Sequence, residues 1–139
     1  MKNLIITLSL LMLTSVTLMA QVKDYKVVFD VTSGDTTVWK TALRQASGVI
    51  ATDPSAKIEI VIYGEALNML IKDKSIVAAA VQELAAKKQQ ASIRVCQVTM
   101  KRHNVDATML VPGVEPVPDG IYEVISKQRE GWGYIKVAK

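Results

Sequence analysis

The chain has 139 residues, half of them hydrophobic, with 17 Lys and Arg against 13 Asp and Glu. This length fits one domain behind a short leader. The basic residues are spread out, and Lys87–Lys88 and Lys101–Arg102 are the only basic pairs, which argues against a nucleic-acid-binding surface.

Residues 1–20 have the pattern of a secretory signal peptide, with Lys2 ahead of the apolar stretch 4–13 and a plausible cleavage site after Ala20. The apolar stretch is short for a membrane span, which needs roughly 20 apolar residues. An uncleaved N-terminal anchor is the alternative. We therefore expect an exported protein, periplasmic in a Gram-negative cell and free of the membrane after cleavage, with residues 21–139 as its single domain.

The first half of this domain alternates predicted strands and helices. Residues 25–31 are rich in β-branched and aromatic types and predict a strand. Asp35 is a good N-cap for an amphipathic helix, which Asp53 and Pro54 end. The apolar residues 58–63 predict a second strand, and a short helix over residues 65–71 follows.

The second half continues the alternation. A helix from about Ser75 has Ile76 and Val77 on its apolar face, and residues 92–95 form a third strand that ends at Cys96. A short helix or turn over residues 98–103 comes next.

The C-terminal part supplies the remaining elements. Short extended pieces at residues 110–111 and 114–117 precede a helix over residues 120–130 that Asp119 caps. A last strand covers residues 134–137, after a tight turn with Trp132.

This alternation predicts an α/β fold with a mostly parallel five-stranded sheet covered on both sides. In such sheets ligands bind beyond the carboxyl ends of the strands. Three segments bring polar residues to that edge, one after each of the first three strands. The candidate binding residues are Thr32, Ser33, Gly34, Asp35, Gly64, Glu65, Gln97, Val98 and Thr99.

Cys96 is the only cysteine, so the chain cannot form an internal disulfide. As a reactive thiol, its thiolate could be stabilised by the backbone N–H groups and dipole of the following helix, with Lys101 and Arg102 nearby. As a structural thiol, it would pack as a small hydrophobic residue, as free cysteines often do. The residue pattern leaves both interpretations open.

Other chemistries find less support. His103, the only histidine, is expected to face away from Cys96 across the short helix. One Cys and one His cannot supply the ligands of a zinc site, and we predict neither a metal nor a cofactor. Ser33, Gly34 and Asp35 could hold an anion at a helix N-terminus, but ordinary capping is the favoured interpretation.

Four segments in this order and spacing resemble the DsrE/DsrF-like family. They are KVVFDVTSGDTTVWKTAL at 26–43, KIEIVIYGEALNMLIK at 57–72, VCQVTMKRHNV at 95–105 and VPDGIYEVISKQREGWGYIKV at 117–137. The last segment is typical of a subgroup that often carries export signals. His103 and Asn104 depart from the pattern, since they stand where the family usually has a glycine after the arginine.

The resemblance implies a flavodoxin-like three-layer fold, assembled as a trimer or hexamer. It also implies an exported sulfur-relay or sulfurtransferase-like protein. Its cysteine after the third strand, Cys96 here, would carry a persulfide between a donor and an acceptor protein. The alternative is a non-enzymatic oligomeric module that binds a small ligand and has an incidental buried cysteine. A protein of purely structural or interaction role is a third possibility.

Overall fold

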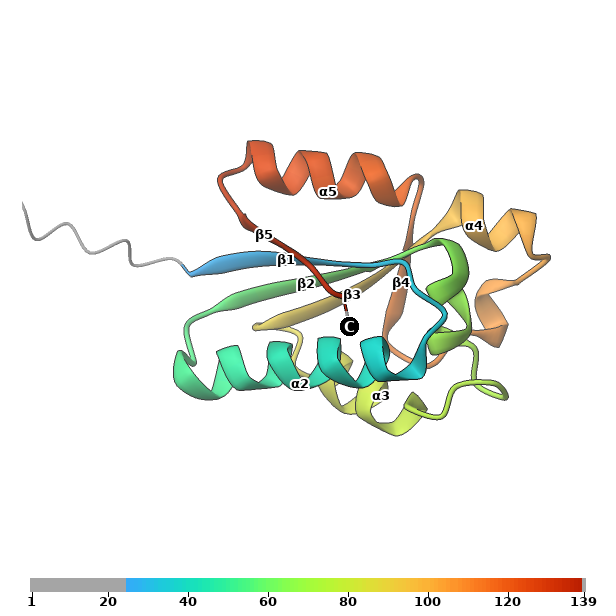
Figure 1. Cartoon of the computed structure of the whole chain (residues 1–139), viewed down its shortest axis with the longest axis horizontal. Coiled ribbons are helices and arrows are strands. Elements are labelled where there is room, and N and C mark those ends of the chain that lie inside the picture. The colour runs from blue at the N-terminus through green and yellow to red at the C-terminus, as the bar shows by residue number, and fades with distance from the viewer. Residues whose placement is uncertain (1–24, 139) are drawn as a thin grey trace, which may run out of the picture.

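The computed structural model describes residues 25–138, so the predicted signal peptide lies outside the described residues (Figure 1). Five strands form one sheet in the order β4-β3-β2-β1-β5, and every pair of neighbours is parallel. The strands are β1 (Lys26–Val31), β2 (Lys57–Ile62), β3 (Ala91–Cys96), β4 (Val114–Val117) and β5 (Gly133–Lys136). The predicted mostly parallel five-stranded sheet is confirmed.

Helices cover both faces of the sheet and give three layers (Figure 1). α2 (Thr36–Thr52) and α3 (Ala78–Ala86) lie on one face, and α5 (Gly120–Arg129) lies on the other. The short elements η2 (Gly64–Leu70), α4 (Gln97–Arg102) and η3 (Ala107–Met109) connect strands at the edge where β1, β2 and β3 end. Among the described residues, no helix has the length and apolar character needed to cross a membrane.

The two faces of the sheet are packed very differently. The large core lies under α2 and α3, where Phe29 of β1 and Ile60 of β2 are fully buried side by side. Under α5 the cluster consists only of Val28, Val61 and Val124, with Tyr63 packed against it. α2 and α3 therefore bury most of the apolar side chains of the sheet, and α5 buries far fewer.

Aspartate side chains cap the N-termini of α2 and α5, as predicted. The Asp35 carboxylate accepts a hydrogen bond from the backbone N–H of Thr37 at 2.8 Å and caps α2. Asp119 accepts from the N–H groups of Ile121 and Tyr122 at 2.8 and 3.0 Å and caps α5. These caps satisfy donors that a helix start leaves unpaired.

One predicted helix begins later than its pattern indicates. α3 begins at Ala78 rather than near Ser75, and Ile76 is 63 % exposed instead of lying on the apolar face. Ser75 Oγ accepts the backbone N–H of Val77 at 3.2 Å, and the N–H of Ser75 donates to the Ile71 carbonyl. These local bonds form a turn that competes with the first turn of the helix.

Candidate functional site

Cys96 is the last residue of β3 and lies at the edge of the sheet where the parallel strands end. It is 5 % exposed and immediately precedes α4. The thiol therefore stands at the edge expected for a ligand site in this fold, but it is covered.

The start of α5 and the side chain of Tyr63 pack around Cys96. A Cβ atom placed on Gly120 would lie 3.2 Å from the Cβ of Cys96 and 3.0 Å from Cδ1 of Tyr63. Tyr63 directly follows β2, so residues from three separate segments meet here. Glycine at position 120 permits this close approach beside the buried Cys96.

A buried carboxylate organises the neighbouring end of β1. Asp30 is 5 % exposed, and its Oδ2 accepts a hydrogen bond from the Tyr134 hydroxyl at 2.8 Å. Lys136 Nζ lies 3.2 Å from Asp30 Oδ1 and donates to Thr32 Oγ1 at 2.7 Å. The same ammonium lies 5.8 Å from the centroid of the Tyr63 ring. Polar contacts thus extend from β5 across β1 to the tyrosine beside Cys96.

The two tyrosines of this group are held in their neutral form. Burial, and after it the nearby carboxylate of Asp30, raise the pKa of Tyr63 to about 12. Burial and the hydrogen bond to Asp30 also raise the pKa of Tyr134. Both phenols therefore stay protonated near neutral pH, and the Tyr134 hydroxyl donates its hydrogen bond to Asp30.

The predicted binding residues after β1 make hydrogen bonds within the domain. Ser33 Oγ accepts the N–H of Asp35 at 3.1 Å, and the Ser33 carbonyl accepts Trp39 Nε1 at 2.7 Å. Asp35 caps α2, and Thr32 Oγ1 accepts a hydrogen bond from Lys136 Nζ. Thr32, Ser33 and Asp35 therefore all take part in hydrogen bonds within the fold.

The residues after β3 fall into two groups. Gln97 and Val98 are exposed on α4. Thr99 is buried, and its Oγ1 accepts the backbone N–H of Gly64 at 3.2 Å. This bond ties α4 to η2, so the ends of β2 and β3 are held together.

Gly34, Gly64 and Glu65 line a hollow of about 340 Å³ at the same end of the molecule. Asn68, Lys74 and His103 contribute further polar side chains to its wall. His103 and Cys96 share no hydrogen bond within residues 25–138, and Cys96 does not line the hollow. No group of three His, Cys, Asp or Glu side chains that could bind a metal ion occurs in this described part.

The principal neighbours of Cys96 are absent from the residues that sequence reasoning selected. Tyr63 and Gly120, which lie beside Cys96, come from segments far from it in sequence, as do Tyr134 and Lys136, which contact Asp30. Because side chains alternate between the two faces of a strand, Asp30 lies on the face of β1 opposite to that of Phe29. This alternation is a feature of the sequence from which an interior polar group at Asp30 could have been predicted. The pairing of Asp30 with Lys136 required the β1–β5 register.

The profile of the DsrE/DsrF-like family matches residues 26–137 of the chain. No curated protein gives a significant match. A solved structure of a protein of unknown function, MTH1491 from Methanobacterium thermoautotrophicum, is 30% identical with a TM-score of 0.76, over 81% of this chain and 99% of that one.

Two further solved structures share the fold. The ychN protein from E. coli is 12% identical with a TM-score of 0.66, over 81% of this chain and 98% of its own. The conserved protein of unknown function BT1422 from Bacteroides thetaiotaomicron is 18% identical with a TM-score of 0.60, over 81% and 95%.

Proposed function

This chain belongs to the DsrE/DsrF-like family, and we propose that it is a sulfur-relay protein in which Cys96 carries sulfur as a persulfide. Sulfur relay is the role that the family suggests. The observation that carries the proposal is the position of Cys96, the only cysteine, at the carboxyl end of β3 and directly before α4. We expect the backbone N–H groups of residues 97–99 to stabilise its thiolate.

The proposed reaction consists of two thiol exchange steps. The Cys96 thiolate attacks the terminal sulfur of a donor persulfide, a new S–S bond forms at Cys96, and the donor leaves as a thiolate. An acceptor thiolate then attacks the terminal sulfur on Cys96, which regenerates the Cys96 thiolate. No external oxidant or reductant is consumed, because one S–S bond forms for each that breaks.

Intact-protein mass spectrometry after incubation with glutathione persulfide tests this proposal. We expect the protein without residues 1–20 to gain one sulfur atom, which a reducing thiol removes. Cys96→Ser should gain none. Equal sulfur gain by Cys96→Ser, or none by the native protein after prolonged incubation, contradicts the proposal.

The hollow lined by Glu65, Lys74 and His103 favours a second candidate function, a binding module in which the buried Cys96 is incidental. The hollow has the acidic Glu65 and the basic Lys74 in its wall, and its volume fits a small polar molecule. This alternative predicts a thiol that reacts only on denaturation and a melting temperature that a ligand raises. Rapid thiol reaction in the native protein, with no stabilising ligand found, counts against it.

Self-association into a trimer or hexamer is part of the proposal. Ile121, Tyr122 and Ile125 form an exposed apolar surface on α5, and such surfaces often mark interfaces. Light scattering should give the mass of a trimer or hexamer, and Ile125→Asp should lower it. A monomeric native protein at micromolar concentration would remove this part of the proposal.

Export by a cleaved leader is also proposed. Expression of the full chain in a Gram-negative host should release a periplasmic protein that begins at Gln21. A product that retains its N-terminus and stays with the membrane fraction would instead support the uncleaved anchor.

A further inference from the structure

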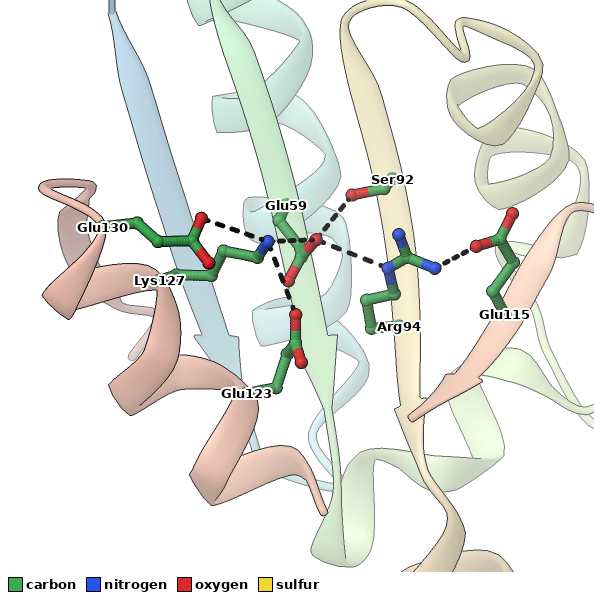
Figure 2. A network of polar contacts seen from close by, with 7 residues as sticks. All are labelled: Glu59, Ser92, Arg94, Glu115, Glu123, Lys127 and Glu130. Atoms are coloured by element: carbon green, nitrogen blue, oxygen red, sulfur yellow. Dashed lines mark hydrogen bonds and ion pairs between the residues drawn. The ribbon is translucent and has the colours of Figure 1, made fainter. Parts of the chain in front are cut away.

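A second polar cluster lies between the sheet and α5, away from Cys96 (Figure 2). Glu59, in the middle of β2, is 2 % exposed, and its Oε2 accepts a hydrogen bond from Ser92 Oγ at 2.9 Å. Arg94 Nε lies 3.4 Å from the same oxygen, and Lys127 Nζ of α5 lies 3.9 Å from it. We call this group the Glu59 cluster: Glu59, Ser92, Arg94, Glu115, Glu123, Lys127 and Glu130.

Lys127 joins α5 to the sheet through this cluster. Its ammonium also lies 3.6 Å from Glu123 and from Glu130, and 5.1 Å from the centroid of the Trp132 ring. Only 18 % of its side chain is exposed, so its charge is partly shielded from water. Removing Lys127 would leave the carboxyl groups around it without their common cation, and the loss of one partner from a partly buried charged group is destabilising.

The other oxygen of Glu59 has no partner within the described residues. A buried ionised carboxylate with an unpaired oxygen is costly, whereas a protonated one can donate a hydrogen bond. Burial raises the pKa of Glu59, and the neighbouring carboxyl group of Glu123 raises it further, while Lys127 and Ser92 oppose both. The free oxygen is thus the natural site of the proton.

The charges that face Glu59 support this protonation. β3 contributes Arg94, β4 contributes Glu115 through its pair with Arg94, and α5 contributes Glu123, Lys127 and Glu130. The residue of β1 paired with Glu59 is the apolar Val28. The Glu59 cluster therefore contains four carboxyl groups but two cations. Ionisation of the buried Glu59 adds a negative charge that no further cation balances.

α5 has few other contacts that hold it on the sheet. Its buried residues are Gly120 and Val124, whereas α2 buries six side chains. Elements with little buried apolar surface open locally at a lower free energy than the rest of the fold. Because Gly120 packs on Cys96, such an opening would expose the thiol.

We propose that α5 is a cover over Cys96 that opens locally, and that protonated Glu59 together with Lys127 is the latch that holds this cover on the sheet. The latch weakens as pH rises, because ionised Glu59 leaves a charged oxygen buried without a partner and repels Glu123. The role of opening in sulfur transfer rests on the proposed function of Cys96, whereas the latch does not.

Hydrogen exchange tests the latch in the protein without residues 1–20. The exchange rate of α5 amides is compared with that of α2 amides in the same sample at pH 5 and pH 8, after correction for intrinsic exchange. In the native protein we expect the ratio to rise roughly three- to tenfold with pH, as for the loss of one buried polar interaction.

Three variants sharpen this test. Glu59→Gln should hold α5 closed at both pH values, because its amide is neutral at both. Lys127→Met should raise the ratio at pH 8. The control Arg129→Met removes a cation of α5 that makes no ion pair within residues 25–138, and it should behave as the native protein.

Two results would overturn the latch: a native ratio that does not change with pH, or a Lys127→Met ratio that equals the native one. If Glu59→Gln does not fold, the native protein and Lys127→Met still decide the matter. The latch and the sulfur-carrier proposal can also fail separately. If α5 exchange responds as expected but Cys96 gains no sulfur, the carrier proposal fails and the latch stands.

Discussion

Gly120 lies directly against Cys96, so closely that a Cβ atom on residue 120 would lie 3.2 Å from the Cβ of Cys96. This contact joins the start of α5 to the end of β3 and buries the single thiol of the chain. Cys96 is 5 % exposed, so a sulfur donor of the proposed relay would need the thiol to become more accessible. The helix that covers the thiol is thus as relevant to its chemistry as the residues that flank it.

Gly120→Ala should destabilise the protein and expose Cys96. The new methyl would lie 3.0 Å from Cδ1 of Tyr63, and an aromatic ring packed in the fold yields with difficulty. We expect a loss of about 1–3 kcal/mol of unfolding free energy, with faster reaction of Cys96 with a maleimide. Chemical denaturation and labelling kinetics measure the two effects.

Gly48→Ala is the matched control for that substitution. Gly48 lies inside α2, and a Cβ there has no atom within 4 Å. It should stabilise the protein by about 0.5–1 kcal/mol and leave Cys96 labelling unchanged. Equal effects of the two substitutions would show that the contact at position 120 is unimportant.

Tyr134→Phe should weaken the buried group around Asp30. It removes the donor that lies 2.8 Å from Asp30 Oδ2 and leaves Lys136 in place. We expect a loss of about 1–3 kcal/mol, because a buried carboxylate oxygen loses its partner. Tyr122→Phe serves as control, since Tyr122 is 67 % exposed and its hydroxyl makes no hydrogen bond within the described residues. Similar melting temperatures for both variants would refute this role of Tyr134.

Glu59 should make stability fall as pH rises above the ordinary glutamate value of 4.5. Burial raises the folded-state pKa, so between 4.5 and that raised value the folded state binds more protons than the unfolded state. The stabilisation from the bound proton is complete below this window and is lost as pH rises through it.

Urea denaturation at several pH values, compared between the native protein and Glu59→Gln, isolates this contribution. The difference in unfolding free energy between the two should change across the window, in favour of Glu59→Gln at the higher pH. Since exposed carboxylates titrate alike in both proteins, they cancel in the difference. A difference that is constant with pH would show that Glu59 does not retain its proton in the folded state.

Local signals in the chain were sufficient for the order and type of most elements. The β-branched stretches became parallel strands, and Asp35 and Asp119 cap helices as their positions predicted. Cys96 ends β3 at the expected edge. Strand periodicity and capping depend on residues a few positions apart, so both can be predicted from the sequence.

Contacts between segments far apart in the sequence could not be predicted from such local patterns. Asp30 and Lys136 are 106 positions apart, and Glu59 and Arg94 are 35 positions apart. Both pairs lie on the α5 face of the sheet, where polar side chains are buried because α5 covers them. Which side chains meet there depends on strand register and on the placement of α5, and both are set by packing of the whole domain. The surroundings of Cys96, and hence its access to a partner, follow from that packing.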